Sequence, residues 1–312
     1  MARRPQPVEA AQPVLRARVV AAFGRHFLAD DGGAEPRACI VRGRRSDVAC
    51  GDWVMLQPGD PATIERVLPR RNALWREDAW RSKVFAANLD LLLVVTAAEP
   101  APNLELVGRA LVAASAQDLQ ALVVLNKCEL PATQALLRRL QPLRDCGYPL
   151  LEVSAAAQPR QAVEQLLPWL QERSSLLIGA SGVGKSTLAN ALIPGLHART
   201  GDISRALDSG RHTTTSTRLW PIPGLPDGSA LLDSPGFQAF GLNHLSVSQL
   251  QHALPELALR NGSCRFHNCT HREEPGCAVR DAVARGEIDG ERYALYLRIL
   301  QELLQAQRHP KA

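Results

Sequence analysis

The sequence has no hydrophobic run long enough to cross a membrane. Its longest uncharged apolar stretch lies near Leu91 to Ala98, far shorter than the roughly 20 residues that a transmembrane helix needs. The first residues, MARRPQPVEAAQPVLRARVV, carry charge and lack the apolar stretch of a signal peptide. We therefore expect a cytoplasmic protein that does not bind a membrane.

The cysteine content does not suit a disulfide framework. The chain has seven cysteines, an odd number, and three of them lie close to histidine between residues 264 and 277, which favours metal binding in a reducing compartment. With 312 residues, 46% of them hydrophobic, the chain can bury a sizeable core and form two or three domains.

A surplus of one charge sign occurs only in the first quarter of the chain, and the formal net charge is +5. Residues 1–83 contain 15 Lys plus Arg and 10 Asp plus Glu, whereas residues 84–312 contain 21 of each, which together give the totals of 36 and 31. The first quarter is a candidate surface for a polyanion, although an imbalance of this size also suits an ordinary solvated surface.

Short apolar or β-branched runs, separated by Gly, Pro and Asp, occupy residues 14–83. The runs are RARVVAAF, ACIVRG, DWVMLQ and TIERVL, and their spacing predicts a small closed β-barrel. An OB-type barrel, which binds oligonucleotides on one face, is the first candidate, and an SH3-like barrel is the alternative. Residues 1–13 are expected to be a disordered tail.

From about Leu89 the pattern changes to apolar strands alternating with amphipathic helices. Strands are predicted at 89–95, 119–125, 149–153, 174–178 and 229–233. This pattern indicates an α/β domain with a parallel sheet covered on both faces, which we place at residues 84–243. Because ligands bind beyond the carboxyl ends of parallel strands, the polar motifs that follow these strands should meet at one edge.

The strongest of these motifs is a phosphate loop, GASGVGKST, which follows a predicted strand and opens a helix. Its glycines let successive backbone N–H groups point at phosphate oxygens, and the helix N-terminus adds its dipole. We expect Lys185 to reach the β- and γ-phosphates and Ser186 to bind Mg²⁺. The predicted nucleotide-binding residues of this loop are Gly179, Ala180, Ser181, Gly182, Val183, Gly184, Lys185, Ser186 and Thr187.

Two segments after the phosphate loop suit the same nucleotide. In DSPG, Asp233 is expected to hold Mg²⁺ directly or through water, with the Gly236 N–H near the γ-phosphate. The intervening SGRHTTTSTR indicates a switch loop in which Thr213 and Thr214 reach the nucleotide and Thr214 binds its Mg²⁺. An ordinary turn and a solvated loop are the respective alternatives.

The segment NKCE is typical of a guanine-binding loop. Asn126 is expected to read the O6/N7 edge, the Lys127 stem to pack along the ring beside Cys128, and Glu129 to accept from N1–H and the 2-amino group. Adenine would leave that carboxylate unpaired. VSAAA, at the end of a later strand, is the expected second base loop, with Ser154 and Ala155 near the purine.

The motif order is base, base, phosphate, switch, Mg²⁺, which is a circular permutation of the usual GTPase order. Such a permutation is possible where the original chain ends lie close together. One consequence is that the segment after DSPG continues directly into the carboxy-terminal domain, residues 244–312. A nucleotide-dependent movement of that segment would therefore reach this domain.

That domain contains CRFHNCTHREEPGC, and the spacing C-x4-C-x-H-x5-C suits a closed tetrahedral zinc site of structural type. His267 is a further candidate ligand, and reduced cysteines in a small core are the alternative. The predicted ligands are Cys264, Cys269, His271 and Cys277.

The permuted order, the GRHTTT switch and the zinc pattern together resemble the small ribosomal subunit biogenesis GTPase A family of bacteria over nearly the whole chain. The resemblance implies an amino-terminal OB barrel, a permuted GTPase domain and a helical zinc-binding domain, and it leaves His267 outside the zinc site. It also implies a monomer that binds the small ribosomal subunit and its RNA and assists late maturation. GTP hydrolysis would be stimulated by the subunit and coupled to release, with Mg²⁺ and one structural zinc.

Two positions depart from the family pattern. This chain has Glu129 and Ser234 where the family usually has Asp and Thr. The first departure bears on the selection of guanine over adenine. A third feature concerns catalysis, because Phe237 occupies the place of the water-orienting Gln of many GTPases. The resemblance makes His212 the catalytic candidate, since its side chain can perform this task, with Gln238 as the alternative.

Two other functions remain open at this point. An ATP-using phosphate-loop enzyme would make NKCE a coincidence. A passive RNA-binding adaptor would use nucleotide only to hold its fold, but the intact Lys185, Ser186 and Asp233 argue against it.

Overall fold

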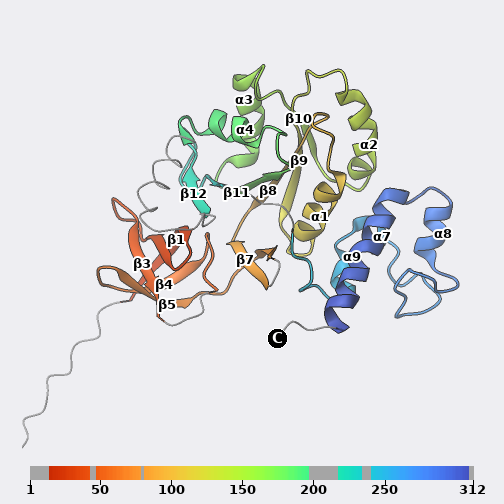
Figure 1. The fold of residues 1–312 in the computed structure, drawn as a ribbon, viewed down its shortest axis with the longest axis horizontal. Helices are drawn as coiled ribbons and strands as arrows, with labels where there is room; N and C mark the ends of the chain where they lie inside the picture. The colour runs from red at the N-terminus through yellow and green to blue at the C-terminus, as the bar shows by residue number, and fades with distance from the viewer. Residues whose placement is uncertain (1–13, 43–46, 79–80, 197–216, 234–239, 309–312) are drawn as a thin grey trace, which may run out of the picture.

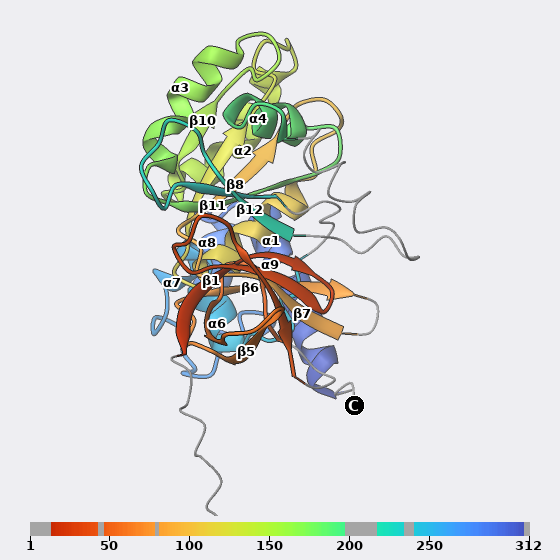
Figure 2. The ribbon, with the colours of Figure 1, turned by 90° about the vertical axis from the view of Figure 1, so that its left-hand side faces the viewer.

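The computed structural model describes residues 14–42, 47–78, 81–196, 217–233 and 240–308. A β-barrel, an α/β domain and a helical carboxy-terminal module lie side by side, with a small hairpin near the centre (Figures 1 and 2). Within the described residues, no helix is both long and apolar enough to span a membrane.

The amino-terminal barrel has five strands and its own apolar core. Neighbouring strands close in the order β1–β2–β3–β5–β4–β1, with β3 and β5 parallel and the other pairs antiparallel. Two alternate residues of β1, Ala17 and Val19, point into the core. This Greek-key closure confirms the predicted OB-type barrel. The strands are β1 (Leu15–Phe23), β2 (His26–Asp30), β3 (Arg37–Val41), β4 (Trp53–Gln57) and β5 (Ala62–Val67).

A two-stranded hairpin follows the barrel and was not anticipated from the sequence. It is formed by β6 (Ala73–Asp78) and β7 (Arg81–Ala87). Its second strand is fixed to the barrel, because the Ala87 N–H donates to the Cys50 carbonyl at 2.9 Å.

The α/β domain is built on five parallel strands in the order β10–β9–β8–β11–β13. They occur where the apolar runs predict them, and the apolar stretches of all of them except the edge strand β10 are buried because helices cover both faces. The strands are β8 (Leu91–Thr96), β9 (Gln120–Leu125), β10 (Leu150–Glu152), β11 (Ser174–Gly179) and β13 (Ala230–Asp233). The helices are α1 (Leu104–Ser115), α2 (Thr133–Asp145), α3 (Pro159–Leu170) and α4 (Lys185–Leu192).

One strand of this sheet is antiparallel and was missed by the sequence analysis. Strand β12 (Thr217–Pro221) pairs with β13 on one side and with β1 of the barrel on the other, where Ala21 lies opposite Arg218. The barrel and the α/β sheet therefore form one continuous sheet of eleven strands.

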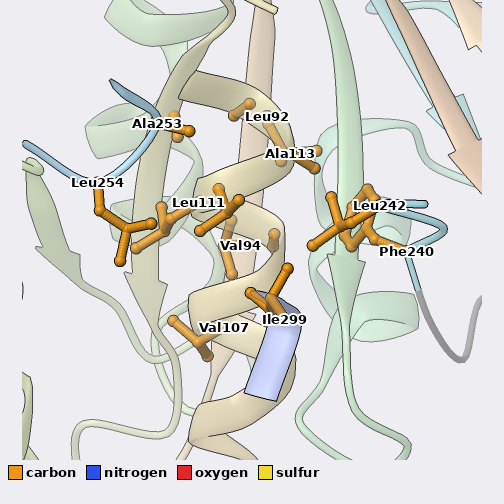
Figure 3. Packing of buried hydrophobic residues seen from close by; sticks show 14 of the residues in the cluster. Leu92, Val94, Val107, Leu111, Ala113, Phe240, Leu242, Ala253, Leu254 and Ile299 are labelled. Carbon is orange, nitrogen blue, oxygen red and sulfur yellow. The ribbon is translucent and has the colours of Figure 1, made fainter. Parts of the chain in front are cut away.

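The carboxy-terminal module packs on one face of the α/β sheet. Figure 3 shows Val107 and Leu111 of α1 between Leu92 and Val94 of β8 and Ile299 of the last helix. The opposite face of the sheet is covered by α3 and α4 through a separate cluster. The helices of the module are α6 (Val247–His252), α7 (Pro255–Ala258), α8 (Ala278–Ala284) and α9 (Gly290–Arg308).

Candidate functional site

The phosphate loop connects the end of β11 to the start of α4, as its sequence predicts. Three of its glycines have positive φ, at 154° for Gly179, 79° for Gly182 and 95° for Gly184. Two of them also sit where a side chain has no room. A Cβ on Gly179 would lie 2.2 Å from the Val95 carbonyl oxygen, and one on Gly184 would lie 2.2 Å from Nδ2 of Asn126. These positions therefore require glycine for both conformation and space.

The side chains at the start of α4 lie at the carboxyl edge of the sheet. Lys185 curls back over the loop, and its Nζ donates to the Ala180 carbonyl at 2.7 Å. Ser186 and Thr187 are exposed in the first turn of the helix, where backbone N–H groups without helical partners attract anions. The arrangement suits a polyphosphate.

Asn126 ties the base-binding side of the site to the phosphate loop. The residue is 2% exposed. Nδ2 donates to the Val183 carbonyl at 2.8 Å, and Oδ1 accepts from the Ala155 N–H at 3.0 Å. The three predicted loops thus meet at one side chain. The sequence predicts a base contact for Asn126 but not this contact with the phosphate loop.

The rest of NKCE contacts the loops that follow β8 and β10. Lys127 has a φ of 60°, and its Nζ donates to the Glu99 carbonyl at 2.9 Å. The Cys128 N–H donates to the Val153 carbonyl at 3.1 Å. The Ser154 hydroxyl donates a hydrogen bond to Oε2 of Glu129. Burial raises the pKa of the Cys128 thiol, helped by the nearby Glu129 carboxylate.

The predicted Mg²⁺ and switch residues are only partly covered by the structure. Asp233 ends β13 at the same edge of the sheet as Gly179, opposite Arg218 of β12. His212, Thr213, Thr214 and Gly236 lie outside the described residues.

The four predicted zinc ligands come together in the carboxy-terminal module. Their donor atoms all lie within 4.8 Å of one another. Nδ1 of His271 is 3.5 Å from Sγ of Cys264 and 3.4 Å from Sγ of Cys277, and those two sulfurs are 4.0 Å apart. A tetrahedral zinc needs edges of about 3.8 Å between sulfurs and about 3.6 Å between sulfur and nitrogen. The donor set and its spacing therefore fit zinc, and His267 is exposed outside the cluster.

Residues that the sequence analysis missed hold the ligand loop in shape. The hydroxyls of Tyr293 and Tyr296 on α9 donate to the carbonyls of His271 and Thr270, at 2.6 and 2.7 Å. Glu274 accepts from the Thr270 N–H and hydroxyl at 2.7 and 2.6 Å and from the Arg272 N–H at 2.9 Å. Burial opposes ionisation of Glu274, but these hydrogen bonds lower its pKa to about 2. The apolar periodicity of α9 predicts a helix packed on a core. It does not predict the hydrogen bonds of the two tyrosine hydroxyls or of Glu274.

The fold, the phosphate loop and the motif order define the class of protein as a circularly permuted phosphate-loop GTPase. A profile of the RsgA GTPase family matches residues 67–243, more than half of the chain. The chain belongs to the RsgA GTPase family, as the sequence resemblance implied.

Two curated relatives illustrate the similarity. The chain is 52% identical over 297 residues to the small ribosomal subunit biogenesis GTPase RsgA of Paraburkholderia phytofirmans, covering 93% of this chain and 94% of the relative. It is 50% identical over 288 residues to the protein of the same name from Bordetella pertussis, covering 91% and 95%.

Two solved structures share the fold. YjeQ from Thermotoga maritima has a TM-score of 0.70 at 28% identity, covering 94% of this chain and 99% of that one. YloQ, described as a circularly permuted GTPase, has a TM-score of 0.67 at 23% identity, covering 98% and 100%. The second similarity concerns the fold alone.

Proposed function

We propose that this protein hydrolyses GTP, binds the small ribosomal subunit and assists its late maturation, with hydrolysis stimulated by the subunit and coupled to release. The observation that carries the proposal is the meeting of the phosphate loop and both base loops at Asn126. The relatives named above, which are similar over almost their whole length, give the biological context.

In this proposal, the residues of the site divide between the two ends of the nucleotide. The N–H groups of 179–187 and the Lys185 ammonium bind the phosphates. Asn126, Lys127, Cys128, Glu129, Ser154 and Ala155 surround the guanine, and the Glu129 carboxylate accepts from its donor edge. Once a bound base covers this carboxylate, adenine is penalised because it offers no matching donors.

Magnesium and zinc have separate places in the proposal. Ser186, Asp233 and Thr214 are the proposed Mg²⁺ ligands, and the ion would neutralise phosphate charge. Cys264, Cys269, His271 and Cys277 would hold a structural zinc, since four protein ligands leave no position for a substrate. Thr213 and the Gly236 N–H would contact the γ-phosphate side, and His212 would orient the attacking water.

The remaining elements are proposed from the sequence and the family. The barrel, residues 14–83, and the module, residues 244–312, flank the GTPase domain of 84–243. We propose that together they contact ribosomal RNA, and that the protein acts as a cytoplasmic monomer. The surplus of Lys and Arg in residues 1–83 supports the RNA contact.

The test is the GTP hydrolysis rate with and without purified small ribosomal subunits, with ATP measured in parallel. A large rise with GTP alone is the expected result. Equal use of ATP would favour the general phosphate-loop enzyme, and no turnover with subunits present would favour the passive adaptor. Lys185→Ala should abolish the hydrolysis of GTP and of ATP alike, and any activity left in this variant would come from contaminating enzymes.

A further inference from the structure

A cavity of about 80 Å³, partly open to solvent, lies between the GTPase domain and the carboxy-terminal module. Helices α1, α2 and α9 form its walls, and none of its lining residues belongs to the phosphate loop or to the base loops. Its apolar lining comprises Leu104, Val107, Leu140, Pro142, Leu143 and Leu295. A lining of this kind favours the apolar part of a small ligand.

Arg292 on α9 brings polar groups without a partner to this cavity. Its side chain is 7% exposed, and its Nε donates to Oε1 of the buried Glu256 at 2.7 Å. Its Nη1 and Nη2 are buried and have no hydrogen-bond partner among the residues that the structure describes. Because a buried donor without an acceptor is costly, a molecule that supplies an acceptor here would be stabilised.

The missing side chain of Gly108 on α1 allows Nη1 of Arg292 to lie at the cavity wall. A Cβ on Gly108 would be 3.7 Å from this nitrogen and 2.3 Å from Cδ2 of Leu295. All three residues line the cavity. The Leu295 methyl group therefore lies beside the guanidinium, and a change of the Leu295 rotamer would let an acceptor reach it.

The charges around the cavity balance, and this balance determines which kind of acceptor fits. Three cations and three anions line it, namely Arg139, Arg292, Arg298, Glu105, Asp289 and Glu291. Arg139 pairs with Glu291 at 3.4 Å, and Arg298 pairs with Glu105 at 3.6 Å. Arg292 is already paired with Glu256. A bound anion would therefore lose its hydration without meeting an uncompensated cation, whereas an uncharged carbonyl can accept from the guanidinium without this cost.

We propose that this cavity is a binding site for a small uncharged molecule that combines an apolar body with a carbonyl oxygen. The apolar body lies against the leucines of α1 and α2, and the carbonyl accepts from Nη1 or Nη2 of Arg292. Because α1 and α2 belong to the GTPase domain and α9 to the module, such a ligand contacts both parts and stabilises their packing. The site is separate from the one proposed for the nucleotide.

Three probes with a similar branched apolar body and different head groups test the proposal: isobutyramide, isobutyrate and isobutylamine. Their binding to the full chain without nucleotide is measured by NMR titration, with the Nε–H signal of Arg292 and the amide signals of α1 and α9 as reporters. For so small a ligand we expect isobutyramide to bind with a dissociation constant on the order of 1 mM. The two charged probes should bind about ten-fold more weakly or not at all. Isobutyrate binding as tightly as the amide would overturn the uncharged ligand, and the lack of a saturable shift with any probe would overturn the site.

Two single variants test whether binding takes place inside the cavity. Leu104 is half-buried in the cavity lining, so Leu104→Trp should fill the space and remove the binding of isobutyramide. Leu137→Trp is the matched control, because it adds the same side chain at a half-buried position of α2 outside the cavity lining. It should leave the affinity unchanged. Equal affinities of the two variants for isobutyramide would contradict the proposed location.

A double variant tests the role of the guanidinium. E256Q/R292M replaces the buried ion pair by uncharged side chains, a change that proteins often tolerate, whereas removal of Arg292 alone would leave Glu256 buried without its partner. The double variant should lose the binding of isobutyramide, because the donors to the carbonyl are gone. An affinity equal to that of the wild type would show that Arg292 does not recognise the ligand.

Discussion

Asn126 is the side chain on which the geometry of the candidate site depends most. Asn126→Ala would leave the Val183 carbonyl and the Ala155 N–H without their partners, and both residues are buried. We expect the free energy of unfolding to fall by about 2 kcal/mol and GDP binding to weaken. Denaturant unfolding and GDP titration check this, with the exposed Asn190→Ala of α4 as control. Equal stability of the two variants would contradict it.

Residue types were predictable in this site, but their contacts were not. The glycine spacing predicts a phosphate loop because it follows a strand and opens a helix. The segment NKCE follows another strand and predicts a base-binding loop. The partners of Asn126 lie 57 and 29 positions away, and a local pattern contains no information on such distances. The cluster of three cysteines and one histidine was predictable because all four residues fall within one short segment.

Glu274 gives a prediction of pH dependence. In Glu274→Gln, the amide N–H₂ would face backbone donors that now bind a carboxylate, so we expect a loss of about 1 kcal/mol at pH 7. The pKa of Glu274 is lowered from 4.5 to about 2 in the folded protein. Its stabilisation is therefore complete above pH 4.5 and is lost as the pH falls toward 2.

Thermal unfolding of the wild type and of Glu274→Gln from pH 7 to pH 3, at equal zinc concentration, measures this effect. The difference between their unfolding temperatures should narrow below pH 4.5, because the glutamine does not titrate. A difference that is constant over this range would show that the carboxylate charge is not the cause.

At the scale of elements, the β6–β7 hairpin clamps the segment that follows DSPG. The Gly241 N–H donates to the Trp75 carbonyl at 3.0 Å. The backbones of Arg76 and Phe240 form an isolated antiparallel β-bridge. The Trp75 ring stacks on His244 with centroids 3.9 Å apart. The segment therefore contacts the hairpin before it reaches the carboxy-terminal module, which the motif order alone did not indicate.

Trp75→Ala removes the stacking on His244 but still allows the backbone hydrogen bond from the Gly241 N–H to the carbonyl of residue 75. Since an aromatic pair contributes about 1 kcal/mol, we expect the Gly241 amide to exchange roughly five-fold faster with deuterium, while amides of β9 do not change. Trp75→Phe keeps an aromatic ring and should restore most of the protection. Unchanged exchange at Gly241 in the alanine variant would mean that the ring does not hold the segment.

The elements that were missed share a weak local signal. The strand β12 has five residues and ends in proline, and β6 and β7 mix charged and apolar residues, so neither shows the long apolar run that identifies the central strands. The strand β12 pairs with the distant β1 as well as with β13, whereas β6 and β7 pair with each other. Tertiary contacts, rather than propensity, decide that they are strands.

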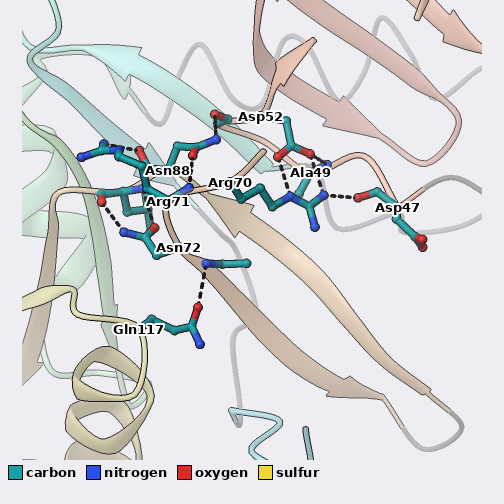
Figure 4. A network of polar contacts seen from close by, with 11 residues as sticks. Asp47, Ala49, Asp52, Arg70, Arg71, Asn72, Asn88 and Gln117 are labelled. Atoms are coloured by element: carbon teal, nitrogen blue, oxygen red, sulfur yellow. Dashed lines mark hydrogen bonds and ion pairs between the residues drawn. The ribbon is translucent and has the colours of Figure 1, made fainter. Parts of the chain in front are cut away.

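At the scale of the whole molecule, the barrel is joined to the GTPase domain by a buried polar network as well as by the β1–β12 pairing. Figure 4 shows Asn88 in this network, 2% exposed and with a φ of 54°. Its Nδ2 donates to the Gly51 carbonyl at 3.0 Å, and its Oδ1 accepts from the Arg71 N–H at 2.9 Å. Nearby, Arg70 pairs with the buried Asp52 at 2.7 Å.

Two substitutions at Asn88 separate its hydrogen bonds from its backbone conformation. Asn88→Gly removes the side-chain bonds and keeps the positive φ without strain, and we expect a loss of about 2 kcal/mol. Asn88→Ala also forces alanine into the left-handed region, which adds about 1 kcal/mol. In both variants the barrel should unfold in a separate, earlier transition by calorimetry, because its rigid attachment is weakened while its own core is unchanged. A single transition as in the wild type would show that the β1–β12 pairing alone makes the two domains one cooperative unit.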